Sequence, residues 1–239
     1  LRPWADAVRA ARVVFCTNDT DRIYLNEQIG LPESRIVEIG AGTDDNQFGC
    51  GEHRLSEGTL PRLLWMGPWT QRRGAESIVN AFRLLRAEFP QIHLRIVAPD
   101  ADPAAIRSAF PESDRDGVEV ETDFSDLGRR SQYLQHDIHI ATAPSERYDP
   151  TVLESAAAGM ALVLLAPHGP VPGFASDSEC IAVPENDPQA IAAAVRRLIN
   201  DTDLATRLRF GAVAKARTFP WSAVASQVES GYKQAVKPV

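Results

Sequence analysis

The feature that most limits what this chain can fold into is the alternation of short apolar runs with helical segments. Eight runs have the length and composition of β-strands: residues 13–16, 35–39, 63–66, 94–98, 118–120, 138–141, 161–166 and 180–183. Most are separated by patterns of helical period, such as residues 77–89, where Ile78, Phe82 and Leu85 share one face. Strands that alternate with helices form a parallel sheet covered on both faces. The predicted fold class is therefore α/β, with a doubly wound parallel sheet.

The C-terminal part of the chain and one polar stretch indicate the domain organisation. From Pro188 onward the pattern is helical almost throughout. Residues 43–59 are polar and lack a regular pattern, which is typical of a linker. We therefore expect residues 1–44 to be a remnant of another domain, residues 45–60 a linker, and residues 61–239 the doubly wound domain with a helical C-terminal tail. Because the sequence starts without Met, we expect it to belong to a longer parent.

Charge and cysteine content exclude several classes of protein. The formal net charge of −7 at pH 7 argues against non-specific binding to nucleic acid, which depends on a basic surface. A local pair of arginines can still bind a phosphate in an acidic protein. Neither a transmembrane segment nor a secretory signal is predicted. The cysteines Cys16, Cys50 and Cys180 form no CxxC pair, which is typical of reduced thiols in a cytoplasmic protein.

The loop after the run 63–66 has a composition that suits a phosphate. Residues 67–74 have the sequence Gly-Pro-Trp-Thr-Gln-Arg-Arg-Gly and lead into a predicted helix. Glycines allow close approach of the backbone, Arg72 and Arg73 supply fixed positive charge, and a helix N-terminus carries a partial positive charge. The ending of a Walker A loop is missing. A solvent-exposed turn with two surface arginines explains the same residues equally well.

A second loop, after the run 138–141, carries two glutamates. Pro150 suits the first turn of a helix, and Gly159 suits its C-terminal end. Glu146 then lies in the loop before the helix, and Glu154 lies about one turn into it among small apolar residues. A carboxylate in that setting is costly to bury without a partner. Hydroxyl groups of a sugar or a ribose would satisfy it, and so would an internal arginine.

In order and spacing, these segments resemble the C-terminal domain of glycosyltransferase family 4, the group 1 enzymes. The resemblance covers residues 61–235. It rests on the loop from Gly67 to Gly74 with Arg73 in the place of a lysine, on Pro144, Ser145, Glu146, Glu154 and Gly159, and on the segments Asn-Asp-Pro at 186–188 and Phe-Pro-Trp at 219–221. Residues 1–44 also resemble the end of the family's N-terminal domain.

The resemblance implies a GT-B fold with a Rossmann-like sheet and a retaining glycosyltransferase of carbohydrate biosynthesis. The donor, a nucleoside diphosphate sugar, would be bound by Gly67, Arg72, Arg73, Glu146, Pro150, Thr151 and Glu154. Arg72 and Arg73 would bind the diphosphate beside the helix start at residues 150–151. Glu154 would bind the ribose hydroxyls and Glu146 the transferred sugar. Glu146 and Arg73 are the predicted catalytic residues, and no side-chain nucleophile is assigned.

Partners and location follow from the same resemblance. The acceptor, a glycan or a small molecule, would bind mainly to the N-terminal domain, of which residues 1–44 are the end. We therefore expect the 239-residue chain alone to be inactive. No metal or cofactor is expected, since the nucleotide sugar is a substrate. The parent is expected to be cytoplasmic, with peripheral contact to a membrane left open.

Departures from the family pattern keep alternatives open. Pro68 stands where the family usually has arginine, and Asp149 stands where it often has glycine and where a carboxylate would repel a diphosphate. The main alternative function is therefore that of a degenerate nucleotide-binding or interaction module without turnover. A metal-dependent GT-A transferase needs an Asp-x-Asp motif, and residues 100–102 and 114–116 match it. A Rossmann dehydrogenase is disfavoured because Gly-Ala-Gly at 40–42 runs into the polar linker and not into a helix.

Overall fold

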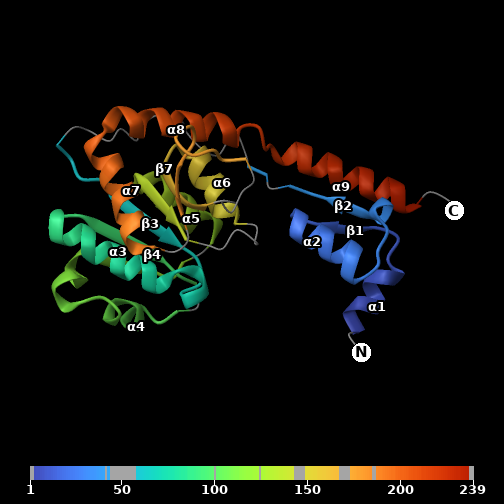
Figure 1. Ribbon diagram of the computed structural model, residues 1–239, viewed down its shortest axis with the longest axis horizontal. Coiled ribbons are helices and arrows are strands. Elements are labelled where there is room, and N and C mark those ends of the chain that lie inside the picture. The colour runs from blue at the N-terminus through green and yellow to red at the C-terminus, as the bar shows by residue number, and fades with distance from the viewer. Residues whose placement is uncertain are drawn as a thin grey trace.

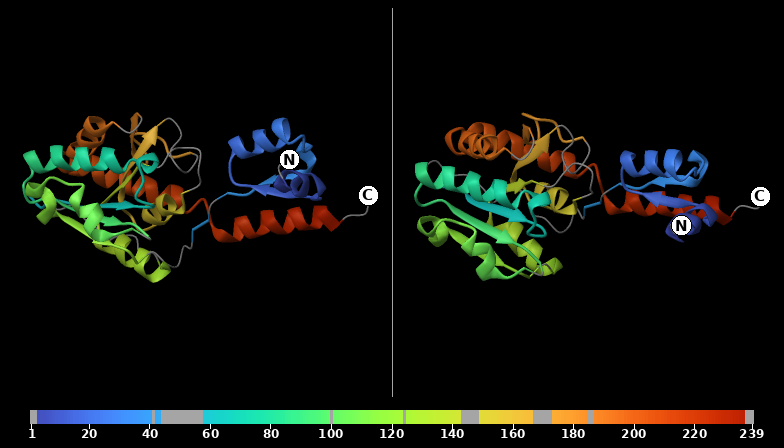
Figure 2. Two further views of the ribbon diagram at one scale, coloured as in Figure 1. Left: turned by 90° about the horizontal axis from the view of Figure 1, so that it is seen from below. Right: turned by 60° about the horizontal axis from the view of Figure 1, so that its bottom comes forward.

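The protein folds into two lobes of unequal size. The computed structural model describes residues 3–40, 42–43, 58–99, 101–123, 125–142, 149–166, 173–184 and 187–236. Figures 1 and 2 show a large α/β lobe and a smaller lobe formed by the N-terminal segment, with the last helix lying along the smaller lobe. Within the part of the chain that the structure describes, no helix is long and apolar enough to cross a membrane.

A six-stranded parallel sheet forms the centre of the large lobe. Its strands are β3 (Arg62–Met66), β4 (His93–Val97), β5 (Val118–Glu121), β6 (Ile138–Ala141), β7 (Ala161–Ala166) and β8 (Ile181–Pro184). They lie in the order β5-β4-β3-β6-β7-β8, and every pairing is parallel. This is the Rossmann strand order. From β3 to β5 successive strands are added toward one edge of the sheet, and from β6 to β8 they are added toward the other, so the order reverses between β3 and β6. The predicted α/β fold with a doubly wound parallel sheet is confirmed.

Helices cover both faces of this sheet, because alternate side chains of each strand point to opposite faces. The helices of the large lobe are α3 (Ala75–Glu88), α4 (Pro103–Ser108), α5 (Asp126–Gln135), α6 (Pro150–Ala157), α7 (Pro188–Asn200) and α8 (Thr202–Ala216). Leu63 and Trp65 pack in one core with α3 and α7. Leu64 and Met66 pack in the other with α6 and the C-terminal part of α8. Burial on both faces explains why the strands are almost uninterrupted apolar runs.

The small lobe is built on a two-stranded parallel sheet. Its elements are α1 (Pro3–Ala10), β1 (Val14–Cys16), α2 (Asp19–Ile23), the π-helix η1 (Tyr24–Gln28), the 3-10 turn η2 (Glu33–Arg35) and β2 (Ile36–Glu38). Two strands alone are rarely stable. Helix α9 (Trp221–Val236), which the sequence assigns to the domain 61–239, covers this sheet. Its Gly231 lies against the ring of Phe15, and the rings of Phe15 and Tyr232 are 5.5 Å apart.

The chain passes between the lobes twice, and the two passages are hydrogen-bonded to each other. The Thr43 N–H donates to the Phe219 carbonyl at 2.7 Å, and the Trp221 N–H donates to the Thr43 carbonyl at 3.2 Å. Gly42 lies so close to the Trp221 indole that a Cβ there would collide with the ring. Segments that are far apart in sequence therefore form one junction. The predicted linker at 45–60 falls mostly outside the described residues.

Candidate functional site

The carboxyl ends of β3 and β6 lie side by side where the strand order reverses. β3 and β6 are direct neighbours, with Leu63 opposite Ile138. In open parallel sheets, ligands bind beyond the carboxyl ends of the strands at this reversal. The loop 67–74 follows β3, and helix α6 begins at Pro150 in the segment that follows β6. The loop 67–74 and the start of α6 therefore lie at the position where this fold class holds its ligands. Residues 143–148 of the second loop lie outside the described residues.

Two glycines and an aromatic contact set the shape of the loop 67–74. Gly67 has φ 140° and Gly74 has φ 81°, a region that residues with a side chain rarely adopt. Between them, residues 71–73 form the 3-10 turn η3 (Gln71–Arg73). Trp69 packs edge-on against Trp65 of β3, with ring centroids 5.3 Å apart. The loop is thus anchored to the sheet and is not a free surface turn.

Arg73 is held at both its backbone and its side chain. Its carbonyl accepts a hydrogen bond from the Thr142 hydroxyl at 2.6 Å, and that hydroxyl accepts one from the Trp65 indole at 2.7 Å. Its guanidinium lies beside Gly67, where an added Cβ would be 4.0 Å from Nη1. The same Nη1 donates to Oδ2 of Asp149 at 3.0 Å, and the two side chains are 21% and 7% exposed. Arg72 lies on the exposed side of the turn.

Asp149 also caps helix α6. Its Oδ1 accepts from the Thr151 backbone N–H at 3.1 Å and from the Thr151 hydroxyl at 2.6 Å. An aspartate at this position satisfies amide groups that have no partner within the helix, and its charge is favourable at the positive end of the helix dipole. Sequence reasoning treated Asp149 only as a source of repulsion. The Asp-Pro pair at 149–150 was the signal for the cap, because proline favours the first helical position and aspartate the one before it.

Glu154 lies one turn further along α6 and is paired with helix α5. Arg129 donates from Nε to Oε2 at 3.2 Å and from Nη2 to Oε1 at 3.4 Å, and the Tyr133 hydroxyl donates to Oε2 at 2.8 Å. Burial, together with the negative charge of Glu154, raises the pKa of Tyr133 well above its usual value. The Glu154 side chain keeps 21% exposure. An internal arginine, Arg129, therefore contacts this carboxylate. The role of Glu154 in binding a ribose stays a prediction.

His139 is a buried titratable group that sequence reasoning missed. It lies fully buried on β6, directly under α6, and its Nδ1 is 2.8 Å from the Ser155 hydroxyl. That hydroxyl also donates to the Val152 carbonyl at 3.0 Å. Nε2 has no hydrogen-bond partner in the described structure. Burial lowers the pKa of His139 to about 4, against an opposing effect of the Asp149 charge.

The structure thus brings part of the predicted donor site together. Arg73 and Thr151 contact the Asp149 carboxylate, Gly67 lies beside the Arg73 guanidinium, and Pro150 is at the start of the helix. Arg72 is on the same turn as Arg73. Glu146 lies outside the described residues.

The two Asp-x-Asp matches have other contacts. Asp102 caps helix α4 by accepting from the Ala104 N–H at 2.9 Å. Asp114 is buried in the 3-10 helix η4 (Glu112–Gly117), and Asp116 is 2.5 Å from Arg86. Asp100 lies outside the described residues. Among those that are described, no three His, Cys, Asp or Glu residues form a group that would hold a metal ion.

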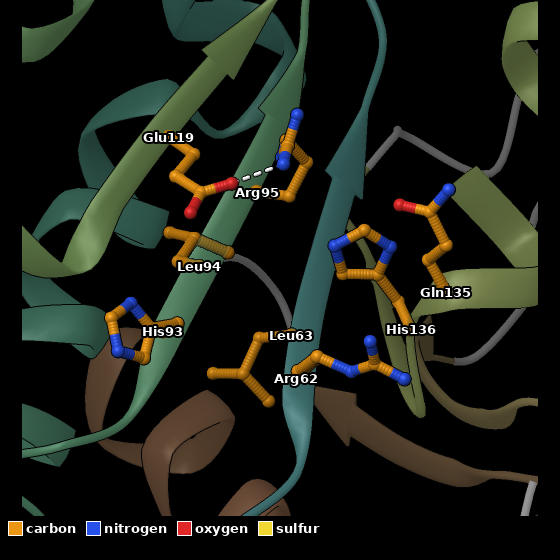
Figure 3. Close-up of a pocket in the computed structure, with 8 residues that line it drawn as sticks. All are labelled: Arg62, Leu63, His93, Leu94, Arg95, Glu119, Gln135 and His136. Carbon is orange, nitrogen blue, oxygen red and sulfur yellow. Dashed lines mark hydrogen bonds and ion pairs between the residues drawn. The ribbon is translucent and has the colours of Figure 1, made fainter. Parts of the chain in front are cut away.

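A cavity of about 290 Å³ lies elsewhere on the sheet (Figure 3). Its lining includes Arg62 and His93, the first residues of β3 and β4, so it is at the amino ends of these strands. Arg95 and Glu119 in its wall form an ion pair with each other. The cavity is therefore at the opposite edge of the sheet from the loops described above.

Comparison with known proteins identifies the family. The family model described as "Glycosyl transferases group 1" matches residues 60–201, which is more than half of the chain. This chain belongs to the group 1 glycosyl transferases. The match covers β3 to α7, including the loop 67–74 and helix α6. It confirms the family that the sequence motifs indicated.

Curated relatives of this group 1 glycosyl transferase are about twice as long as the chain. The D-inositol 3-phosphate glycosyltransferase of Corynebacterium glutamicum (strain R) is 28% identical over an alignment that covers 84% of this chain and 52% of the relative. The protein of the same name from Frankia alni is 31% identical over an alignment that covers 96% of this chain and 60% of the relative. The chain thus spans a little over half the length of these relatives.

Solved structures show that this group 1 glycosyl transferase shares its fold with known GT-B enzymes. A glycosyltransferase from Rickettsia africae has a TM-score of 0.77 at 17% identity, over 100% of this chain and 68% of the other. Anabaena HepE in complex with UDP-glucose has a TM-score of 0.78 at 14% identity, over 97% and 66%. At such identities the likeness establishes the fold alone.

Proposed function

We propose that this chain binds a nucleoside diphosphate sugar at the reversal between β3 and β6. It would thereby supply the donor-binding part of a retaining glycosyltransferase. The observation that carries the proposal is the position of Arg73 beside the N-terminus of α6, with the backbone of Gly67 open next to it. These groups combine fixed positive charge, free approach of a ligand and a helix dipole. The fold shared with HepE, which was solved with UDP-glucose, supports the proposal.

In this proposal the protein acts mainly on the leaving diphosphate. Arg72, Arg73 and the amides at the start of α6 stabilise the negative charge that grows on it as the sugar departs. Glu154 binds the ribose hydroxyls and Glu146 the transferred sugar. No side chain is assigned as nucleophile, because the departing diphosphate can assist removal of the acceptor proton. No metal is assigned, since the arginines and the helix N-terminus supply the positive charge.

The acceptor would be a glycan or a small molecule. The curated relatives are named D-inositol 3-phosphate glycosyltransferases, which makes that compound the first acceptor to assay with a longer protein containing this chain. We expect the 239 residues alone to transfer no sugar, because catalysis requires both substrates to be oriented together and the chain spans about half of the relatives. A role in cytoplasmic carbohydrate biosynthesis is part of the same proposal.

Nucleoside diphosphates are expected to bind this chain without added metal. The test is calorimetric titration with UDP, GDP and ADP in EDTA and again with manganese. Binding of at least one of them in EDTA is the expected result. Binding that disappears in EDTA and returns with manganese would favour a metal-dependent site. Failure of all three to bind under both conditions would favour an interaction module and contradict the proposal.

Replacing Glu154 by alanine is expected to weaken nucleotide binding by about 1–3 kcal/mol, the range for a hydrogen bond to a charged group. It should also lower stability, because Arg129 and the buried Tyr133 hydroxyl lose their hydrogen bonds to Glu154. The measurement is calorimetric titration of both proteins with the ribonucleotide and with its 2′-deoxy form. If Glu154 binds the ribose, the wild type prefers the ribonucleotide and Glu154→Ala loses that preference. Unchanged binding together with a lower melting temperature would make Glu154 a purely structural residue.

A further inference from the structure

Three helices of the large lobe begin with an aspartate followed by a proline, and one of these aspartates differs from the others. Asp102, Asp149 and Asp187 cap α4, α6 and α7, each accepting from the backbone N–H two residues on. Asp102 and Asp187 are exposed to solvent. The Asp149 side chain is only 7% exposed and also binds Arg73. Capping alone therefore does not account for the burial and pairing of Asp149.

The carboxylate of Asp149 bridges two elements that are distant in sequence. One oxygen accepts from the backbone and hydroxyl of Thr151 at the start of α6, and the other accepts from the Arg73 guanidinium. A phosphate group presents the same chemistry, since its negatively charged oxygens accept from helix N-terminal amides and from arginine. Asp149 thus occupies the same donors that the proposed function assigns to the diphosphate of the donor.

We propose that Asp149 is an internal substitute for a donor phosphate, and that the donor binds by displacing it from Arg73. The inference rests on the proposed function. A diphosphate and the Asp149 carboxylate cannot both be neutralised by one guanidinium, and like charges at short distance in a partly buried site repel strongly. The carboxylate therefore keeps the free site in a self-paired state and weakens donor binding. Displacement would leave Arg73 paired with the diphosphate.

Asp149 could instead favour donor binding, and the same experiment distinguishes this role from the one proposed. Asp149 would then hold Arg73 in the geometry that binds the diphosphate, and its loss would weaken binding. The two roles predict opposite signs for a change that removes only the charge. The substitution Asp149→Asn keeps an oxygen that can cap α6, since asparagine and aspartate are about equally good caps.

The test compares the wild type with Asp149→Asn and with Asp187→Asn, the matched control at an exposed cap. Calorimetry would measure the affinity for UDP, GDP and ADP and for uridine, guanosine and adenosine. We expect Asp149→Asn to bind the preferred nucleoside diphosphate at least about 10-fold more tightly than the wild type does, since removing one repelling charge from a partly buried site has an effect of this order. The affinity for the matching nucleoside, which has no phosphate, should change less than about 2-fold, because no charge on that ligand faces Asp149. Asp187→Asn should bind both ligands as the wild type does.

Each other outcome contradicts the inference in a distinct way. Weaker binding by Asp149→Asn would assign Asp149 to positioning Arg73, and unchanged binding would show that the pair does not compete with the diphosphate. An equal gain for the nucleoside would mean that the change opens the site without acting through charge. If neither protein binds any nucleoside diphosphate, the proposed function itself fails. Should Asp149→Asn not fold by circular dichroism, Asp149→Ser, which also retains a capping oxygen, replaces it.

Discussion

Replacing Gly211 by alanine is expected to lower the free energy of unfolding by about 3 kcal/mol, the upper range for overpacking a close contact. Gly211 lies in helix α8, where a Cβ would collide with the backbone carbonyl oxygen of Ser178. A backbone atom cannot rotate away as a side chain does, so α8 or the segment 173–184 must shift. Alanine would normally stabilise a helix interior by about 1 kcal/mol relative to glycine, and the collision must outweigh this.

The position of α8 matters for the candidate site, because α8 packs on α6. Arg209 of α8 also donates to the Gly159 carbonyl at the end of α6 at 2.6 Å. Urea denaturation of Gly211→Ala against the wild type measures the effect. Ala214→Gly, at an exposed position of the same helix, is the control for helix propensity and should cost about 1 kcal/mol. A Gly211→Ala protein as stable as the wild type would show that the close approach to Ser178 is not maintained.

Acid is expected to destabilise the protein by about 3 kcal/mol between pH 7 and pH 4 through His139 alone. The folded-state pKa of His139 is about 4, whereas an unfolded histidine titrates near pH 6.5. Between these values the unfolded chain binds more protons than the folded one does. The contribution of His139 is therefore fully present above about pH 6.5 and is lost as the pH falls toward 4. The cause is burial, which makes a charged imidazole on β6 unfavourable.

The variant His139→Leu should lose most of this acid sensitivity. Leucine has no titratable group and removes the Nε2 atom that lacks a hydrogen-bond partner in the described structure. The measurement is the free energy of unfolding at several pH values from 4 to 7. His93→Gln, at an exposed histidine on β4 of the same sheet, is the control and should keep the wild-type slope. His136, whose pKa burial also lowers, accounts for a residual slope. A full wild-type slope in His139→Leu would contradict the assignment.

The secondary structure could be predicted from the sequence, because the patterns that indicate it are local. Each of the eight apolar runs corresponds to a strand, and the helical pattern from Pro188 onward corresponds to α7, α8 and α9. Side-chain period and capping residues act within a few positions of the chain, so a linear sequence displays them. Right-handed crossovers between parallel strands then favour a doubly wound sheet. The motif order on this framework identified the family.

The partners of the ion pairs could not be predicted from the sequence, because they are far apart along the chain. Arg73 and Asp149 are 76 residues apart, and Arg129 and Glu154 are 25 apart. The sequence assigns Arg73 to a diphosphate and Asp149 as a source of repulsion, and it leaves open whether sugar hydroxyls or an internal arginine satisfy Glu154. The tertiary structure pairs all three internally. Their environments depend on which strand lies next to which, and this is decided only when the sheet assembles.

The sequence by itself determined the α/β fold, the eight strands, the C-terminal helices and the family. Only the tertiary structure decided that α9 covers the N-terminal lobe, that His139 is buried under α6, and that Asp149 occupies the positive groups at the start of that helix. The reason is the range of the interactions. Backbone propensity and hydrophobic period act between neighbours in the chain, whereas burial and ion pairing act between neighbours in space.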